Sequence, residues 1–140
     1  MTRINVVPVE SLTDQHLLAE LREITCIPNC VVNGKFKLDG NYPKEYTLGA
    51  GHVKFFTPRL GWLQKRHQLL FDEVTKRGFV ANDYWPDNVP ARFMNDWAPT
   101  EHSIRINVER IKLRWPKNAK YCSMSVDFDK LCDSMLEVNQ

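Results

Sequence analysis

The chain has 140 residues, of which 43% are hydrophobic and 26% charged, a composition typical of a globular protein that excludes a disordered chain. No run approaches the roughly 20 apolar residues of a membrane span, and the N-terminus lacks the basic and then apolar pattern of a secretory signal, so we expect a cytosolic protein with no membrane partner. The net charge of +2 conceals a basic body, because the last sixteen residues hold four acids and one Lys. Such a body suits a polyanionic partner, but a solvated basic face explains the charge equally well.

Apolar residues recur at the spacing of amphipathic helices in four segments. The first predicted helix covers residues 13–25, where Ser11 to Asp14 fits a capping box and leucines follow at helical intervals. The second runs from about Arg59 to Arg77, with Pro58 at its entrance and Gly78 as its stop. We expect its leucines to face inward and its basic residues to face elsewhere.

The third predicted helix begins after Thr100, which can cap it, and closes at Pro116, while a last helix covers Asp127 to Val138. Residues 28–46 and 81–98 are rich in turn-forming residues and are predicted to be irregular connections. With little sign of strands, the predicted fold class is all-α, a compact single-domain helical bundle of about three main helices with long irregular connections. Residues 1–140 are expected to form this one domain.

A polar stripe runs along the first predicted helix. Residues seven apart differ by only about 20° around a straight α-helix, so Gln15 stacks with Arg22 and His16 with Glu23. A solvated face explains such a stripe in any amphipathic helix considered alone. Its nearness to the chain terminus favours chemistry, because an α-amine with a pKa of about 8 is partly neutral at pH 7 and is therefore a nucleophile.

Removal of Met1 would place that amine on Thr2, whose small side chain permits excision by the host aminopeptidase. Arg3 and Arg22 would lower the pKa of the amine by like-charge repulsion, whereas Glu23 would oppose them. The amine would then be poised near neutrality to attack an electrophilic carbon.

The third predicted helix supplies a separate basic surface. Arg110, Arg114 and Lys117 are spaced four and then three residues apart, so the first two share a face if the helix continues to Arg114. Phosphate binding is our preferred interpretation. The alternative is a solvated helix end whose cations complement the helix dipole.

Other residues of reactive types show no recognisable site. The cysteines match no familiar zinc spacing and are expected to be free thiols; they are Cys26, Cys30, Cys122 and Cys132. The run GAGH from Gly49 to His52 favours packing, and His67 and His102 are expected to be packing or surface residues.

Several blocks of the sequence together resemble one enzyme family. They are MTRIN at the start, DQHLLAELREI at 14–24, LGAGHVKFF at 48–56, KRGF at 76–79, and more loosely VPARF at 89–93 followed by DWAPTEHSI at 96–104. In this order and at near-family spacing, they resemble the phage pyrimidine-dimer DNA glycosylases, also called ultraviolet-repair endonuclease V. The resemblance is close over residues 1–25 and 48–79, moderate over 89–114 and weak elsewhere.

The resemblance implies a mostly helical monomer that excises cyclobutane pyrimidine dimers from ultraviolet-damaged double-stranded DNA and then nicks the abasic strand. It implies that the Thr2 amine forms an imine with the sugar and that Glu23 supports both glycosyl cleavage and elimination. Arg3 and Arg22 would hold flanking phosphates, and Gln15 and His16 would position the DNA. No metal or organic cofactor is required, and the site of action would be the host cytoplasm if the chain is viral.

The resemblance also supports phosphate binding at Arg110 and, with Lys replaced by Arg, at Arg114. The sequence departs from the family where Cys26 replaces a basic residue, and the C-terminal aromatic and basic cluster is only partly matched, by Trp115, Lys120 and Tyr121. Residues 122–140 form a divergent C-terminal segment.

Two alternative functions therefore stay open. One is the same imine chemistry on a different base lesion or on abasic sites only. The other is a DNA-binding module without catalysis, whose salt-sensitive binding would survive Glu23→Gln and blocking of Thr2.

Overall fold

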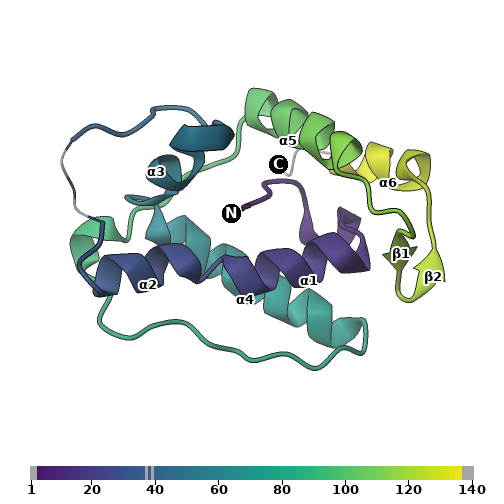
Figure 1. Ribbon diagram of the computed structural model, residues 1–140, viewed down its shortest axis with the longest axis horizontal. Helices are drawn as coiled ribbons and strands as arrows, with labels where there is room; N and C mark the ends of the chain where they lie inside the picture. The colour runs from purple at the N-terminus through teal and green to yellow at the C-terminus, as the bar shows by residue number, and fades with distance from the viewer. Residues whose placement is uncertain (1–2, 37, 39, 137–140) are drawn as a thin grey trace.

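The computed structural model describes residues 3–36, 38 and 40–136, and this part of the chain is mainly helical, as predicted (Figure 1). In chain order the elements are the 3-10 helix η1 (Val9–Ser11), α1 (Asp14–Glu23), α2 (Cys26–Val32), the 3-10 helix η2 (Gly49–Gly51), α3 (His52–Phe56), α4 (Leu60–Lys76), the 3-10 helix η3 (Ala91–Phe93), α5 (Glu101–Leu113), β1 (Lys120–Tyr121), β2 (Met124–Ser125) and α6 (Phe128–Met135). Among the described residues, none of the helices is both long enough and apolar enough to cross a membrane.

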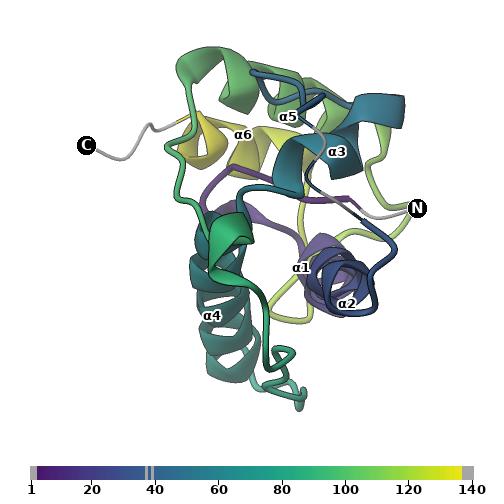
Figure 2. The ribbon, with the colours of Figure 1, turned by 90° about the vertical axis from the view of Figure 1, so that its left-hand side faces the viewer.

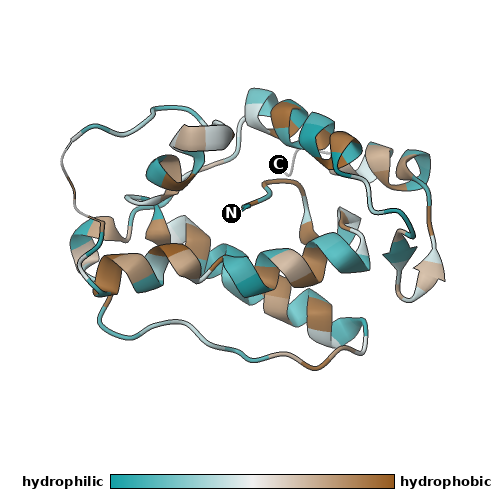
Figure 3. Cartoon of the chain, viewed as in Figure 1, coloured by the Kyte–Doolittle hydropathy of each residue, from teal (hydrophilic) through white to brown (hydrophobic). Residues whose placement is uncertain are grey.

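The N-terminal segment, residues 3–8, lies between two groups of helices. On one side α1 packs along α4, and on the other α5 and α6 lie together (Figures 1 and 2). The segment contributes Ile4, Val6 and Val7 to the hydrophobic core, where each is at most 5% exposed. The long helices carry both hydrophobic and hydrophilic residues (Figure 3), because each buries one face against this core.

The predicted bounds of α4 and the predicted start of α5 agree with the structure. Helix α5 ends at Leu113, before the predicted Pro116, and the predicted end of the last helix, Val138, lies outside the described residues. Helix α4 is followed by Gly78, whose φ of 90° is a conformation that other residues rarely adopt. Helix α5 begins after Thr100, which forms a reciprocal capping box with Ser103. The predicted cap at Ser11 is wrong: Ser11 ends η1, and Thr13 caps α1 by accepting the His16 amide N–H.

The two segments predicted to be irregular contain short helices. Helix α2 includes Pro28, which occupies the third helical position, where a backbone N–H has no partner within the helix and its loss costs little. Helix η3 lies within residues 81–98. The structure also contains the antiparallel hairpin of β1 and β2, which the sequence did not indicate.

Two basic side chains, Arg66 of α4 and Arg77 at its C-terminal cap, are buried, contrary to the prediction that they face away from the core. The guanidinium of Arg66 bonds both carboxylate oxygens of Glu20, at 2.8 and 3.1 Å, and donates to the carbonyl of Val7. Arg77 donates to Asp14 and Glu73, at 2.9 and 2.8 Å. The prediction was wrong because acidic partners from α1 face these positions, and spacing within one helix cannot reveal them.

The buried pair of Arg66 and Glu20 gives a test of this packing. Arg66→Leu should lower the free energy of unfolding by about 3–5 kcal/mol, because it leaves an unpaired carboxylate in the core. The matched control is Lys65→Ala, which breaks an exposed ion pair with Asp96 and should cost at most about 1 kcal/mol. Urea unfolding of both variants measures the difference, and equal losses would contradict the assignment.

Candidate active site

One pocket brings together predicted site residues from three distant parts of the sequence. It lies where the N-terminal segment, α1 and α5 meet, and it is closed on a further side by residues 46–52. The predicted site residues that line it are Arg3, His16, Glu23, Arg110 and Arg114. The N-terminal segment therefore approaches the carboxylate of Glu23 within a basic pocket.

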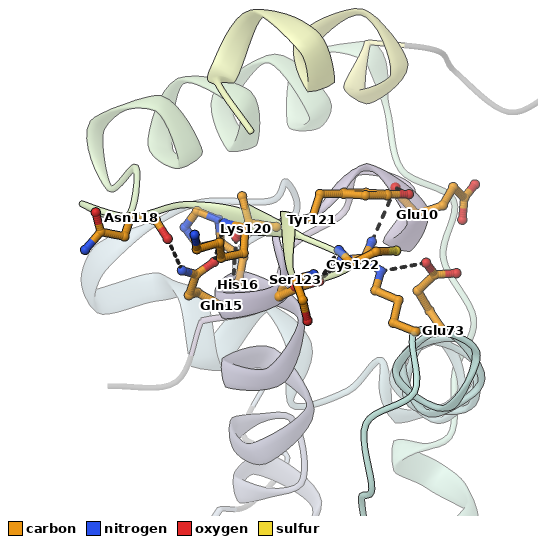
Figure 4. Close-up of polar contacts among 12 residues, drawn as sticks. Glu10, Gln15, His16, Glu73, Asn118, Lys120, Tyr121, Cys122 and Ser123 are labelled. Atoms are coloured by element: carbon orange, nitrogen blue, oxygen red, sulfur yellow. Dashed lines mark hydrogen bonds and ion pairs between the residues drawn. The ribbon is translucent and has the colours of Figure 1, made fainter. Parts of the chain in front are cut away.

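The other predicted site residues lie outside this pocket. The side-chain amide of Gln15 bonds the backbone that follows α5. Its Nε2 donates to the Asn118 carbonyl at 2.6 Å, and its Oε1 accepts the Lys120 N–H at 3.0 Å (Figure 4). Arg22 is exposed and lines a separate groove beside residues 80–84, and Lys117 is exposed beyond the end of α5. Thr2 lies outside the described residues.

Two carboxylates line the pocket, and only one is free to act. Glu20 is 1% exposed and fully engaged, because it accepts hydrogen bonds from Arg66 and, at 2.9 Å, from Asn5. Glu23 is half-buried, and no other described residue forms an ion pair with it. Glu23 is thus the pocket carboxylate that no other described residue engages in an ion pair.

The three arginines of the pocket form a cationic cluster. Burial lowers the pKa of Arg110, and the nearby charges of Arg114 and Arg3 lower it further. The Nε of Arg110 is buried and has no hydrogen-bond partner among the described residues. The gathering of three like charges in one pocket favours an anionic ligand.

His16 is held as a neutral ring at the edge of the pocket. Its Nε2 lies 3.2 Å from the Arg114 carbonyl, and its Nδ1 lies 3.1 Å from the Thr13 hydroxyl. Burial lowers its pKa, and the charge of Arg3 adds to this, although the bond to the carbonyl opposes it. We assign the tautomer with the proton on Nε2, which ties the end of α5 to α1.

Several polar residues that hold the N-terminal segment in the pocket were not predicted. Asn107 of α5 accepts the N–H groups of Val6 and Val7 at 2.7 and 3.2 Å and donates to Asn5 at 2.8 Å. His52 and Tyr46 also line the pocket and bond the backbone of the segment. The only sequence signal was the GAGH run, which contains His52 and indicated packing.

Residues 1–87 match a family model described as pyrimidine dimer DNA glycosylase. The chain belongs to this family. The match covers the N-terminal segment and all of α1 and α4, and it confirms the family resemblance in the sequence. Membership of this family implies a DNA substrate that carries ultraviolet lesions.

The C-terminal segment of the glycosylase lies outside the matched residues, yet it is bound to the first turn of α1. The carboxylate of Asp14 accepts the N–H groups of Cys122 and Ser123 at 2.9 and 2.7 Å. Burial would raise the pKa of Asp14, but these bonds and those from Arg77 outweigh it and lower the pKa. The turn residues Cys122 and Ser123 have φ of 51° and 66°, which for side chains other than Gly requires such compensation.

An aromatic contact completes the attachment of the hairpin. The Tyr121 ring lies 4.1 Å from the Arg77 guanidinium, and its hydroxyl donates to the Glu10 carbonyl at 2.7 Å (Figure 4). Lys120 and Tyr121 are thus engaged in tertiary contacts, and Trp115 packs on Phe128 and His16. The four cysteines are free thiols, as predicted.

The cationic cluster predicts how binding depends on salt. Arg110→Gln and Arg114→Gln should each reduce the slope of log K against log salt by about 0.9, the value for one phosphate contact. Arg105→Gln is the matched control, because Arg105 lies exposed on the same helix, 4.0 Å from Glu101. Titrations with a duplex carrying a stable abasic analogue measure the slopes, and an equal change at Arg105 would refute a localised phosphate site.

The buried histidines predict a loss of stability in mild acid. Burial lowers the pKa of His16, His52 and His67 in the folded protein. In mild acid the unfolded chain therefore binds protons that the folded protein does not. The contribution of these histidines to the free energy of unfolding is fully present above about pH 6.5, and it is lost as the pH falls from there through the lowered pKa values.

Urea unfolding at pH 7.5 and pH 5 measures this loss. His52→Gln should reduce the dependence on pH, because it removes one of these buried histidines. A free energy of unfolding that is the same at both pH values would contradict the prediction.

Proposed function

We propose that this chain excises cyclobutane pyrimidine dimers through an imine between its N-terminal amine and the sugar, and then nicks the abasic strand by β-elimination. The observation that carries the proposal is that Arg3, next to Thr2 in the sequence, shares one pocket with the free carboxylate of Glu23. Membership of the pyrimidine dimer DNA glycosylase family supports a pyrimidine dimer in DNA as the substrate.

The first step joins the amine to the sugar. With Met1 removed, the amine of Thr2 attacks C1′, the bond from C1′ to the pyrimidine nitrogen breaks, and the base leaves with the bonding electrons. Positive charge develops on the sugar, and the carboxylate of Glu23 stabilises it electrostatically. The bond from C1′ to the ring oxygen O4′ then breaks as the sugar ring opens. One amine proton passes to O4′ and the other to the departing base, which yields the imine. Arg3 and the neighbouring arginines favour the neutral, nucleophilic amine by like-charge repulsion.

The second step breaks the strand. The imine acidifies the C2′ proton, Glu23 accepts that proton, and the bond from C3′ to its phosphate oxygen breaks. The phosphate leaves with the electrons, and water later hydrolyses the imine to release the enzyme. One carboxylate serves both steps, which agrees with Glu23 being the pocket carboxylate without an ion pair to another described residue.

The arginines hold the DNA around the reacting sugar. Arg3, Arg110 and Arg114 would contact the flanking phosphates, and the exposed Arg22 and Lys117 would contact phosphates farther along. We propose only a supporting role beside the DNA for Gln15 and His16, because their side chains already bond the backbone between the end of α5 and β1. Residues 1–140 would act as one glycosylase and lyase domain, a monomer in the cytosol that needs no cofactor.

Borohydride trapping tests the chemistry. Protein whose loss of Met1 is verified by intact mass is mixed with one duplex carrying a single thymine dimer and another carrying an abasic site. We expect a covalent adduct and strand cleavage on both. Glu23→Gln should slow cleavage by about 10²–10⁴-fold, the usual contribution of a positioned acid or base, while Glu109→Gln on the exposed face of α5 should not.

The other outcomes separate the alternatives. An adduct on the abasic duplex alone would retain the imine and reject the dimer as substrate. Salt-sensitive binding without an adduct on either duplex would leave a DNA-binding module. Active protein that retains Met1 would rule out Thr2 as the nucleophile.

A further inference from the structure

The backbone of one residue near the N-terminus is held at both of its polar groups by side chains. The N–H of Ile4 donates to Nε2 of His52 at 2.8 Å, and the hydroxyl of Tyr46 donates to the carbonyl of Ile4 at 2.9 Å. Ile4 is 1% exposed, so each bond satisfies a group that has no access to water. We call His52 and Tyr46 the Ile4 clamp.

The clamp is rigid because each ring is fixed by further contacts. Since Nε2 of His52 accepts a hydrogen bond, its Nδ1 carries the proton and donates to the Thr47 carbonyl at 2.9 Å. The Tyr46 ring meets the His52 ring edge to face at 5.5 Å, and Phe56 meets the same imidazole at 5.4 Å. His52 and Tyr46 are only 4% and 3% exposed, so neither ring can swing away without disturbing the core.

The clamp lies between the fixed part of the N-terminal segment and the candidate active site. Asn107 fixes the segment at Val6 and Val7. His52 and Tyr46 fix it at Ile4, and the next residue towards the terminus is Arg3, which lines the pocket with Glu23. Consecutive Cα atoms are about 3.8 Å apart, so a residue held at Ile4 limits how far the terminal amine can move from Glu23.

We propose that His52, assisted by Tyr46, is a positioning residue that sets the reach of the N-terminal chain, so that its amine meets the sugar carbon beside Glu23. This inference rests on the proposed imine function. The clamp does not contact the DNA phosphates in this scheme, since the arginines bind them. Loss of the clamp should therefore slow imine formation while the affinity for DNA stays unchanged.

Single-turnover borohydride trapping on a saturating abasic duplex measures this effect. His52→Leu removes the acceptor for the Ile4 N–H and should slow trapping on the order of 100-fold, the usual effect of a misplacement of about 1 Å. His52→Gln keeps an acceptor and should restore much of the rate. Tyr46→Phe keeps the ring and removes only the hydroxyl, so it tests the clamp with little risk to folding.

Two controls separate positioning from general damage. His67→Leu removes another buried histidine, 3% exposed on α4 and packed on Trp85 outside the pocket, so it should lower stability without slowing trapping. Hydrogen exchange at the Ile4 amide reports the bond directly and should accelerate in His52→Leu. The dissociation constant for the abasic duplex should change by less than about 3-fold, since the phosphate contacts remain.

The outcomes distinguish this inference from the proposed function. Wild-type protein that forms no adduct would overturn the imine function itself. Wild-type protein that traps, with His52→Leu and Tyr46→Phe trapping equally fast, would overturn only the positioning role. A loss of rate in His67→Leu as large as that in His52→Leu would also overturn it, because the effect would then come from stability.

Discussion

The fold depends on the burial of an extended N-terminal segment that has no neighbouring strand to satisfy its backbone hydrogen bonds. Residues 4–7 run between the helix layers, and Ile4, Val6 and Val7 are buried there. An unsatisfied amide or carbonyl group at a buried residue costs about 1–3 kcal/mol. Side chains supply the partners instead. They are His52 and Tyr46 at Ile4, Asn107 at Val6 and Val7, and Arg66 at the Val7 carbonyl. The segment is therefore fixed by four side chains from separate parts of the chain, and its direction into the pocket follows from them.

The same network explains why two glutamates one turn apart on α1 differ in role. Glu20 faces the core and neutralises Arg66, which must be charged to hold the Val7 carbonyl. Glu23 faces the pocket, where the cations outnumber the free carboxylates. The mutual repulsion of these cations is a cost to folding that a bound polyanion would relieve. In the proposed function, stability and chemistry are thus served by different carboxylates, three residues apart.

The periodicity of apolar residues was sufficient to predict α1, α4, α5 and α6, because each buries one continuous face. The family resemblance placed Arg3 and Glu23 in one predicted site, and both residues line the same pocket. The buried Arg66 and Arg77 could not be predicted, since their partners Glu20 and Asp14 lie 46 and 63 residues away. The spacing of residues within α4 reveals neither of these partners.

The hairpin turn and the clamp were missed for the same reason. A turn with positive φ at Cys122 and Ser123 lacks the Gly or Asn that usually indicates such turns, and Asp14 of α1 supplies the compensation. His52 lies in a glycine-containing run that fits packing, and its partner is a backbone N–H 48 residues away. Local sequence carries no information about either partner.

Helix α1 links the C-terminal segment to the proposed chemistry, although the family match ends at residue 87. Three consecutive side chains of its first turn bond residues between the end of α5 and the hairpin turn: Asp14 bonds the turn itself, Gln15 bonds Asn118 and Lys120, and His16 bonds Arg114. Glu23 lies seven residues farther along the helix, about 10 Å at 1.5 Å per residue. This corresponds to about three nucleotides of a DNA strand at 3.4 Å each. A rigid helix thus fixes the distance between the basic end of α5 and Glu23, the proposed reacting carboxylate. In the proposed function, a change in the C-terminal segment would therefore shift the phosphate contacts while leaving Glu23 in place.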